Sequence, residues 1–166
     1  VPLRNRVGSD SVSPPVSFRF LPVPSPLVES DGPLAFCEGD SVRLRTTEAF
    51  ASYTWSAGET AREITVRSSG TYTVQVSNAE GCEALSAPVT VVVHPLPPPP
   101  VITRPGMLLE STPATSWQWY VEEGAVLTEI PGASGKTYAG LPDVWYRVRI
   151  GGANGCSALA APFSYE

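Results

Sequence analysis

The chain has 166 residues, a net charge of −5 and 42% hydrophobic residues. The negative charge and the lack of a basic cluster argue against nucleic acid as a partner. No apolar run approaches the roughly 20 residues that a membrane-spanning helix needs. Charged residues make up 16% of the chain, whereas Pro (18) and Gly (14) are frequent. Because the hydrophobic residues fall in alternating runs, this composition indicates short strands joined by many turns.

The first 25 residues form a segment that resembles nothing later in the chain. The sequence starts at Val1 without an initiator Met or a signal-peptide pattern, so we expect a processed mature protein or a piece of a longer one. Val16, Phe18 and Phe20 alternate as in a strand, and the prolines on both sides restrict it to an edge or isolated position. The segment is either a leader or linker, an edge strand folded back on its own domain, or an assembly arm. We favour an arm that pairs with a neighbouring subunit, because an uncovered apolar edge is normally paired or covered.

The next part of the chain, residues 26–94, has the pattern of a small β domain. Alternating runs at 41–45, 52–56 and 62–67 are separated by turns that contain glycine. Strands that recur every 8–12 residues with glycine turns are typical of an all-β sandwich.

One stretch of the chain is repeated. The residues from Tyr72 to Val91 return as those from Tyr146 to Tyr165, shifted by 74 positions, and nine of the twenty positions are identical. A gapless repeat of this length indicates two copies of one supersecondary unit. The sequence therefore predicts two tandem domains, residues 26–94 and 101–166, joined by a stiff proline-rich linker at 95–100.

The three cysteines are too far apart in sequence for a typical metal site, so we expect no bound metal. Cys37 and Cys82 fall at predicted strand ends and are expected to form a disulfide within the first domain, the alternative being two reduced, buried thiols. Cys156 takes the repeat position of Cys82, and alignment places Arg104 where the first cysteine would be. Cys156 is therefore predicted to be an unpaired buried thiol, the alternative being a bridge to another molecule.

Aromatic residues are the other candidates for function. Trp55 and Trp119 are expected in the cores, which leaves Tyr120 and Trp145 as candidate ligand-facing aromatics for a glycan. The one histidine, His94, lies at the proline linker with no nucleophile or orienting carboxylate beside it. We therefore expect no catalytic residues, no cofactor and no enzymatic activity.

Several segments together resemble the Ig-like repeats of secreted and cell-surface proteins of Bacteroidetes and their relatives. The segments that carry the resemblance are Phe36–Leu44, Tyr53–Thr60, Ile64–Val74 and Asn78–Cys82. The resemblance implies two tandem Ig-like β-sandwich domains, export, and a location outside the cell or on the bacterial cell surface. Such repeats occur in adhesin stalks, in filaments and as spacers beside catalytic domains.

The function expected from the sequence is that of a non-enzymatic extracellular structural protein. It would be a building block of a surface appendage or filament, assembled through β-strand contacts with other copies of itself or with other cell-surface proteins. The alternatives are an adhesin-type or glycan-binding module, or spacer domains of a larger secreted enzyme.

Overall fold

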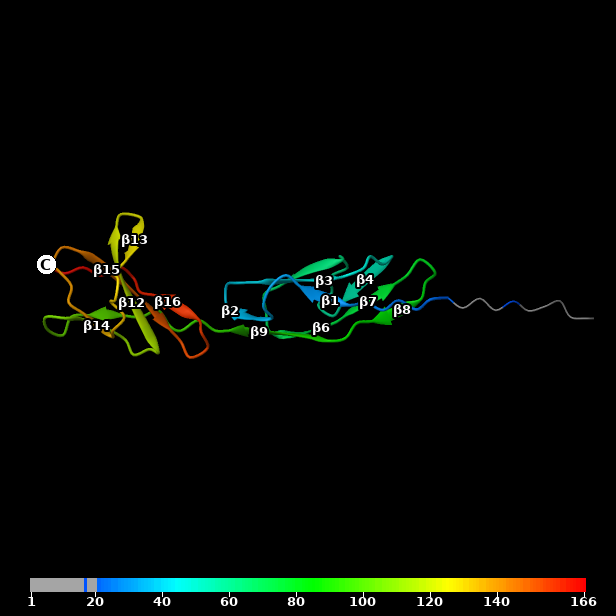
Figure 1. Cartoon of the computed structure of the whole chain (residues 1–166), viewed down its shortest axis with the longest axis horizontal. Helices are drawn as coiled ribbons and strands as arrows, with labels where there is room; N and C mark the ends of the chain where they lie inside the picture. The colour runs from blue at the N-terminus through cyan, green and yellow to red at the C-terminus, as the bar shows by residue number, and fades with distance from the viewer. Residues whose placement is uncertain (1–16, 18–20) are drawn as a thin grey trace, which may run out of the picture.

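The computed structural model describes Ser17 and residues 21–166 (Figure 1). The proposed arm residues Val16, Phe18 and Phe20 lie outside these described residues. Within the described residues the chain consists of sixteen strands and contains no helix, so none that could cross a membrane. The all-β fold class is therefore confirmed.

The strands form two groups that lie end to end in an elongated molecule (Figure 1). We call residues 28–94 the N-terminal unit and residues 102–163 the C-terminal unit. The chain leaves the N-terminal unit at its last strand and enters the C-terminal unit through the proline-rich segment.

The N-terminal unit contains nine strands in two layers. They are β1 (Val28–Ser30), β2 (Ala35–Cys37), β3 (Val42–Thr46), β4 (Ser52–Trp55), β5 (Glu63–Val66), β6 (Gly70–Tyr72), β7 (Val74–Ser77), β8 (Glu83–Leu85) and β9 (Val89–His94). One layer has the order β1-β3-β5. In the other layer, β6 and β7 follow each other along one side of a long hairpin, and β8 and β9 form the opposite side. β4 pairs with β7 on one side, and β2 pairs in parallel with β9 on the other.

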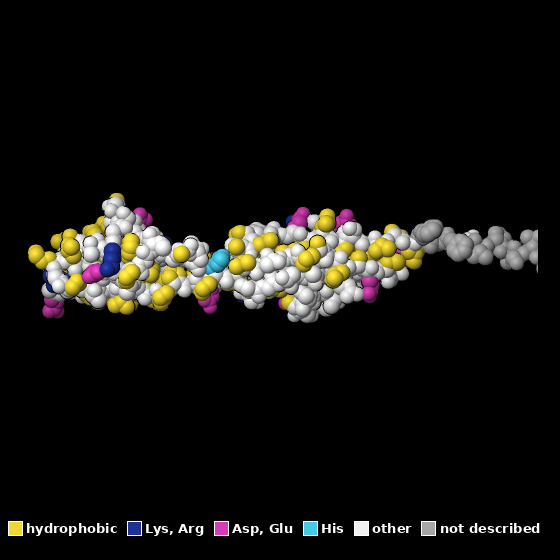
Figure 2. All heavy atoms as spheres, turned by 90° about the horizontal axis from the view of Figure 1, so that it is seen from below, with side chains coloured by type: hydrophobic (Ala, Val, Ile, Leu, Met, Phe, Trp, Pro, Cys, Tyr) yellow, Lys and Arg dark blue, Asp and Glu magenta, His cyan; other side chains and the backbone are white. Residues whose placement is uncertain are grey.

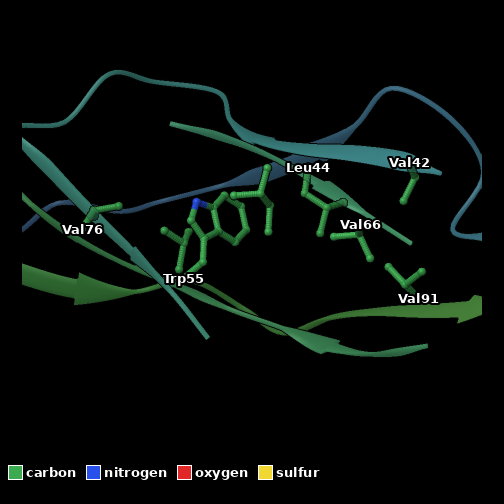
Figure 3. Packing of buried hydrophobic residues seen from close by; sticks show 8 residues of the cluster. Val42, Leu44, Trp55, Val66, Val76 and Val91 are labelled. Atoms are coloured by element: carbon green, nitrogen blue, oxygen red, sulfur yellow. The ribbon is translucent and has the colours of Figure 1, made fainter. Parts of the chain in front are cut away.

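The core of the N-terminal unit follows from alternation along its strands. In β3, Val42, Leu44 and Thr46 are buried while the two arginines between them face solvent. Trp55 from the opposite layer is 2% exposed and packs in the same cluster (Figure 3). Its indole N–H donates to the carbonyl oxygen of Ala61 at 2.8 Å, so its one polar atom is satisfied.

The C-terminal unit contains seven strands, also in two layers. They are β10 (Ile102–Thr103), β11 (Leu109–Ser111), β12 (Ser116–Glu123), β13 (Val126–Glu129), β14 (Thr137–Tyr138), β15 (Trp145–Gly151) and β16 (Ser157–Leu159). The layers have the orders β10-β11-β14 and β13-β12-β15-β16. Trp119 is fully buried and donates to the carbonyl oxygen of Gly135 at 2.9 Å. The prediction that Trp55 and Trp119 are core residues is therefore confirmed.

The sequence repeat corresponds to one hairpin that is built twice. In the first copy Gln75 pairs with Leu85, and in the second Arg149 pairs with Leu159, each shifted by 74 positions. Gly81 and Gly155 turn both hairpins with φ values of +82° and +81°, a backbone region that favours glycine. The two hairpins therefore have the same register and the same type of turn.

Each unit thus has a sheet of three short strands facing a sheet built around this hairpin, which is an arrangement of the immunoglobulin type. The two hydrophobic clusters share no residue. That each unit folds independently as a domain remains a prediction.

Candidate functional site

The most informative site is a disulfide between the two units. Cys37 bonds to Cys156, with 5.7 Å between their Cα atoms and 119 positions between them in sequence. Cys82 is the free cysteine of the part of the chain that the structure describes. The predicted Cys37–Cys82 pair is therefore wrong, and so is the prediction that Cys156 is unpaired.

The reason lies in the direction of β2. Because β2 runs parallel to β9, Cys37 at its end lies opposite His94 at the end of β9, where the chain leaves the unit. Cys82 lies in the turn between β7 and β8, at the far end of the same unit (Figure 1). The equivalent turn of the C-terminal unit carries Cys156 and points back to the linker, so it meets Cys37.

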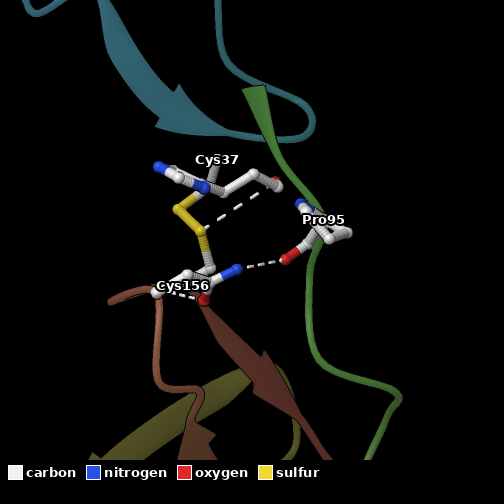
Figure 4. The surroundings of a disulfide bond; sticks show 5 residues. Cys37, Pro95 and Cys156 are labelled. Atoms are coloured by element: carbon white, nitrogen blue, oxygen red, sulfur yellow. Dashed lines mark hydrogen bonds between the residues drawn. A yellow bond between two sulfur atoms is a disulfide. The ribbon is translucent and has the colours of Figure 1, made fainter. Parts of the chain in front are cut away.

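Hydrogen bonds from both units hold the linker beside this disulfide (Figure 4). The Asn154 side-chain amide donates to the carbonyl oxygen of Pro95 at 2.9 Å. The Asn154 side-chain oxygen accepts from the backbone N–H of Cys156 at 3.1 Å, and Glu38 N–H donates to the carbonyl oxygen of His94 at 2.8 Å. The start of the linker is thus fixed by backbone, side-chain and covalent contacts.

Arg104 does not occupy the place of a first cysteine in the C-terminal unit. β10 pairs with β11 as β1 pairs with β3, so Arg104 follows the counterpart of β1 rather than that of β2. Its guanidinium lies 3.9 Å from the centre of the Tyr165 ring. Among the described residues the C-terminal unit has no counterpart of β2, and Cys156 bonds to Cys37 of the other unit because its turn faces the linker.

The two candidate ligand-facing aromatics have different surroundings. Tyr120 is only 9% exposed, and the Arg149 guanidinium lies 5.3 Å from the centre of its ring. Its assignment as a ligand-facing residue is therefore wrong, because its ring is buried beside the Arg149 side chain. Trp145 is 52% exposed and remains a candidate.

Trp145 borders a surface hollow of about 320 Å³, together with Glu122, Gly124 and Pro162. Glu122 lies opposite Trp145 across the β12–β15 ladder. One carboxylate oxygen of Glu122 is 3.5 Å from the Arg147 guanidinium, and the other is buried with no hydrogen-bond partner among the described residues. The exposed indole face can stack on the apolar face of a sugar ring, whereas the unpaired Glu122 oxygen is buried and not open to a ligand hydroxyl.

Glu122 and Arg147 were not among the residues selected from the sequence. The signal that could have found them is the shared two-residue alternation of Tyr120 with Glu122 and of Trp145 with Arg147. It becomes useful only when the pairing of β12 with β15 is known, because the register brings these side chains to one face.

The other notable charged group lies on the N-terminal unit. The Asp31 carboxylate accepts from the backbone N–H of Arg43 and from its side-chain Nε, both at 2.8 Å. These bonds lower the pKa of Asp31 below its usual value of 3.8, the backbone bond contributing most. Glu63 also contacts Arg43 at 3.2 Å, so this is an exposed charge cluster that fastens β3 to its neighbours.

The face shown in Figure 2 carries scattered hydrophobic and uncharged side chains and few basic groups. Within residues 21–166 no group of three or more His, Cys, Asp or Glu side chains is placed to hold a metal ion.

No protein-family model and no curated protein matches the chain. Among solved structures, it is similar to a chain in the crystal structure of the mouse coronavirus receptor-binding domain complexed with its murine receptor. The identity is 10% and the TM-score 0.42, over 86% of this chain and 99% of that chain. It is also similar to the human OSCAR ligand-binding domain, at 14% identity and a TM-score of 0.36, over 84% of this chain and 96% of that one.

A third similar structure is the two fibronectin type III domain segment from chicken tenascin, at 16% identity and a TM-score of 0.27. The match covers 84% of this chain and 97% of that one. All three TM-scores are below 0.5, so these likenesses assign neither a family, a partner nor an activity to the chain.

Proposed function

We propose that this chain is a non-enzymatic structural protein that acts outside the cell, as a building block of a surface appendage or filament. The observation that carries the proposal is the Cys37–Cys156 disulfide, which joins two β-units end to end across a proline-rich linker. A covalent bond beside a stiff linker limits bending between the units, which suits a structural element of a filament.

The disulfide also supports a location outside the cytoplasm. Structural disulfides form and persist in oxidising compartments and are rare where thiols are kept reduced. Together with the sequence resemblance to the Ig-like repeats of Bacteroidetes surface proteins, this favours the bacterial cell surface.

The contact between building blocks is proposed to be strand addition by the N-terminal arm. At the described end of the arm, the Pro22 carbonyl oxygen accepts from the side-chain amide of Asn78 at 2.7 Å. The chain therefore enters the N-terminal unit at the end opposite the linker (Figure 1). An apolar strand extending from this end would pair with a neighbouring subunit, and a head-to-tail contact of this kind extends into a filament.

The arm is tested by replacing its apolar side chains while keeping the chain length. The double variant Phe18→Ser/Phe20→Ser should stay monomeric in sedimentation velocity at a concentration where the unaltered chain forms larger species. Arg19→Ser is the matched control, since alternation places this residue on the other face, and it should assemble normally. Assembly of the double variant at the unaltered level would show that the arm is not the contact.

A second candidate function is glycan binding at the hollow beside Trp145. The observation that favours it is the half-exposed indole of Trp145 at the edge of this hollow. Glycan-array binding should be lost in Trp145→Ala and kept in Leu85→Ala, which alters another exposed apolar side chain, on the other unit. If neither the unaltered chain nor the control binds any glycan, the structural proposal stands alone.

A further inference from the structure

The turn that carries Cys82 has the same construction as the turn that carries Cys156. Asn78 N–H donates to the Cys82 carbonyl oxygen at 3.0 Å, and Gly152 N–H donates to the Cys156 carbonyl oxygen at 2.8 Å. Asn78 and Gly152 are repeat mates, as are the two cysteines. The two thiol positions are therefore equivalent, but only Cys156 is bonded.

The chain segment entering each unit is held against this turn in the same way. In the N-terminal unit, the side-chain oxygen of Asn78 accepts from Cys82 N–H at 2.8 Å while its amide donates to the carbonyl oxygen of Pro22 at 2.7 Å. In the C-terminal unit, Asn154 makes the corresponding bonds to Cys156 and Pro95.

The two asparagines are not repeat mates, because Asn78 corresponds to Gly152 and Asn154 corresponds to Glu80. The same clamp is therefore formed from two different positions of the turn. Simple duplication of the sequence does not account for this. The clamp fixes an incoming proline beside a cysteine in both units.

The bonded unit shows what the second cysteine needs. His94, the residue before Pro95, is the ladder partner of Cys37 in the parallel pair of β2 and β9. This pairing places the Cys37 sulfur beside Cys156. In the N-terminal unit, Leu21 precedes Pro22 as His94 precedes Pro95. A cysteine of another unit that lay beside Leu21, as Cys37 lies beside His94, would therefore face Cys82.

We propose that Cys82 forms a disulfide with a neighbouring β-unit that docks at the Leu21–Pro22 end and carries a cysteine in the position that Cys37 has here. A second copy of this chain does not supply that cysteine. Its Cys37 is already bonded to Cys156, and within the described residues its C-terminal unit has no counterpart of β2. The partner is thus a different β-unit, in the same polypeptide or in another one.

This inference rests on Cys82, Asn78 and Pro22 and not on the strand contact proposed above. Where both contacts form, the subunit that the arm reaches is this different β-unit and not a second copy of the chain. The reaction joins two thiols, which lose two protons and two electrons to a disulfide oxidant. One thiolate attacks the oxidant's disulfide, which forms a mixed disulfide and releases one thiol, and the second thiolate then displaces the oxidant's other sulfur as a second thiol. An oxidising compartment supplies such an oxidant.

The test is peptide mapping of the intact protein taken from its own source, alkylated with N-ethylmaleimide before disruption and digested without reduction. We expect the Cys82 peptide to be linked to a cysteine peptide from outside residues 1–166, with the Cys37–Cys156 pair as the internal reference. The mass of the partner after reduction shows whether it belongs to the same polypeptide.

Two results would overturn the proposal. One is Cys82 recovered as its N-ethylmaleimide adduct in most of the native protein, and the other is Cys82 linked to Cys82 or Cys37 of a second copy. In a further experiment, residues 1–166 are produced alone and oxidised with glutathione disulfide, and any glutathione adduct is then removed by mild reduction. The chain should then carry one alkylatable thiol, that of Cys82. The Cys82→Ser variant should carry none while keeping the junction disulfide.

Discussion

Removing the Cys37–Cys156 disulfide should destabilise the C-terminal unit strongly. When that unit alone unfolds, the disulfide still ties Cys156 to the folded N-terminal unit beside His94, where the chain leaves β9. It therefore closes a loop of about 60 residues, for which the chain-entropy model gives about 4 kcal/mol. For a unit of this size, 1 kcal/mol corresponds to roughly 4–8 °C in Tm, so the expected decrease is on the order of 15–30 °C.

The measurement is differential scanning calorimetry of the Cys37→Ser/Cys156→Ser double variant. Both chains should carry Cys82→Ser, so that Cys82 cannot exchange into the remaining pair. The comparison chain then differs only in the junction disulfide. A decrease in the free energy of unfolding below about 1 kcal/mol would show that the disulfide does not constrain the unfolded C-terminal unit and would refute the loop argument.

Once the disulfide is gone, the same calorimetric traces should contain two separate unfolding transitions, because the two hydrophobic clusters share no residue. A single cooperative transition would contradict the division into two domains. Trp119→Ala should lower the free energy of unfolding by about 3–5 kcal/mol and unfold the C-terminal unit, because it removes a fully buried ring and leaves the Gly135 carbonyl without its donor. A variant with unchanged near-ultraviolet circular dichroism and Tm would contradict this. Asp31 has a lowered pKa, so its charged form stabilises the fold at neutral pH and this contribution is lost as the pH falls through the lowered value. Asp31→Asn should therefore be slightly less stable than the unaltered chain in urea at pH 7, and the difference should vanish in acid; a difference that persists in acid would exclude the Arg43 contacts as its cause.

The sequence was sufficient for the three strands β3, β4 and β5 and for the repeated hairpin. The alternation of Val42 and Leu44 with arginines, and the repeat of Tyr72–Val91, depend on local spacing that the fold preserves. Glycines at the two turns mark places where the backbone needs a positive φ. These features are local, so periodicity and turn chemistry are enough to predict them.

The disulfide could not be predicted in the same way. Strand spacing places Cys37 and Cys82 at strand ends, but which end each cysteine occupies depends on β2 pairing in parallel with β9. A parallel pair between the start and the end of a unit leaves no local signature. Alignment of the two units places Arg104 at the position of the first cysteine, but an alignment does not show that a counterpart of β2 is absent from the described residues of the C-terminal unit.

The candidate ligand site shows the same limit. Tyr120 and Trp145 are both aromatic residues on the outer face of paired strands, yet one is covered and the other is exposed. The difference comes from Arg149, which lies over Tyr120 from the neighbouring strand. Contacts between side chains across strands depend on register, which the sequence alone did not provide.

Electron microscopy of the native protein tests the central proposal most directly, because it separates a polymer from a monomer. We expect filaments or appendages with this chain as a repeating subunit, in which the two β-units lie end to end as in Figure 1. Antibodies against the chain should decorate these structures along their length. Native protein that appears only as single two-unit particles, or as part of a large secreted enzyme, would contradict the proposal.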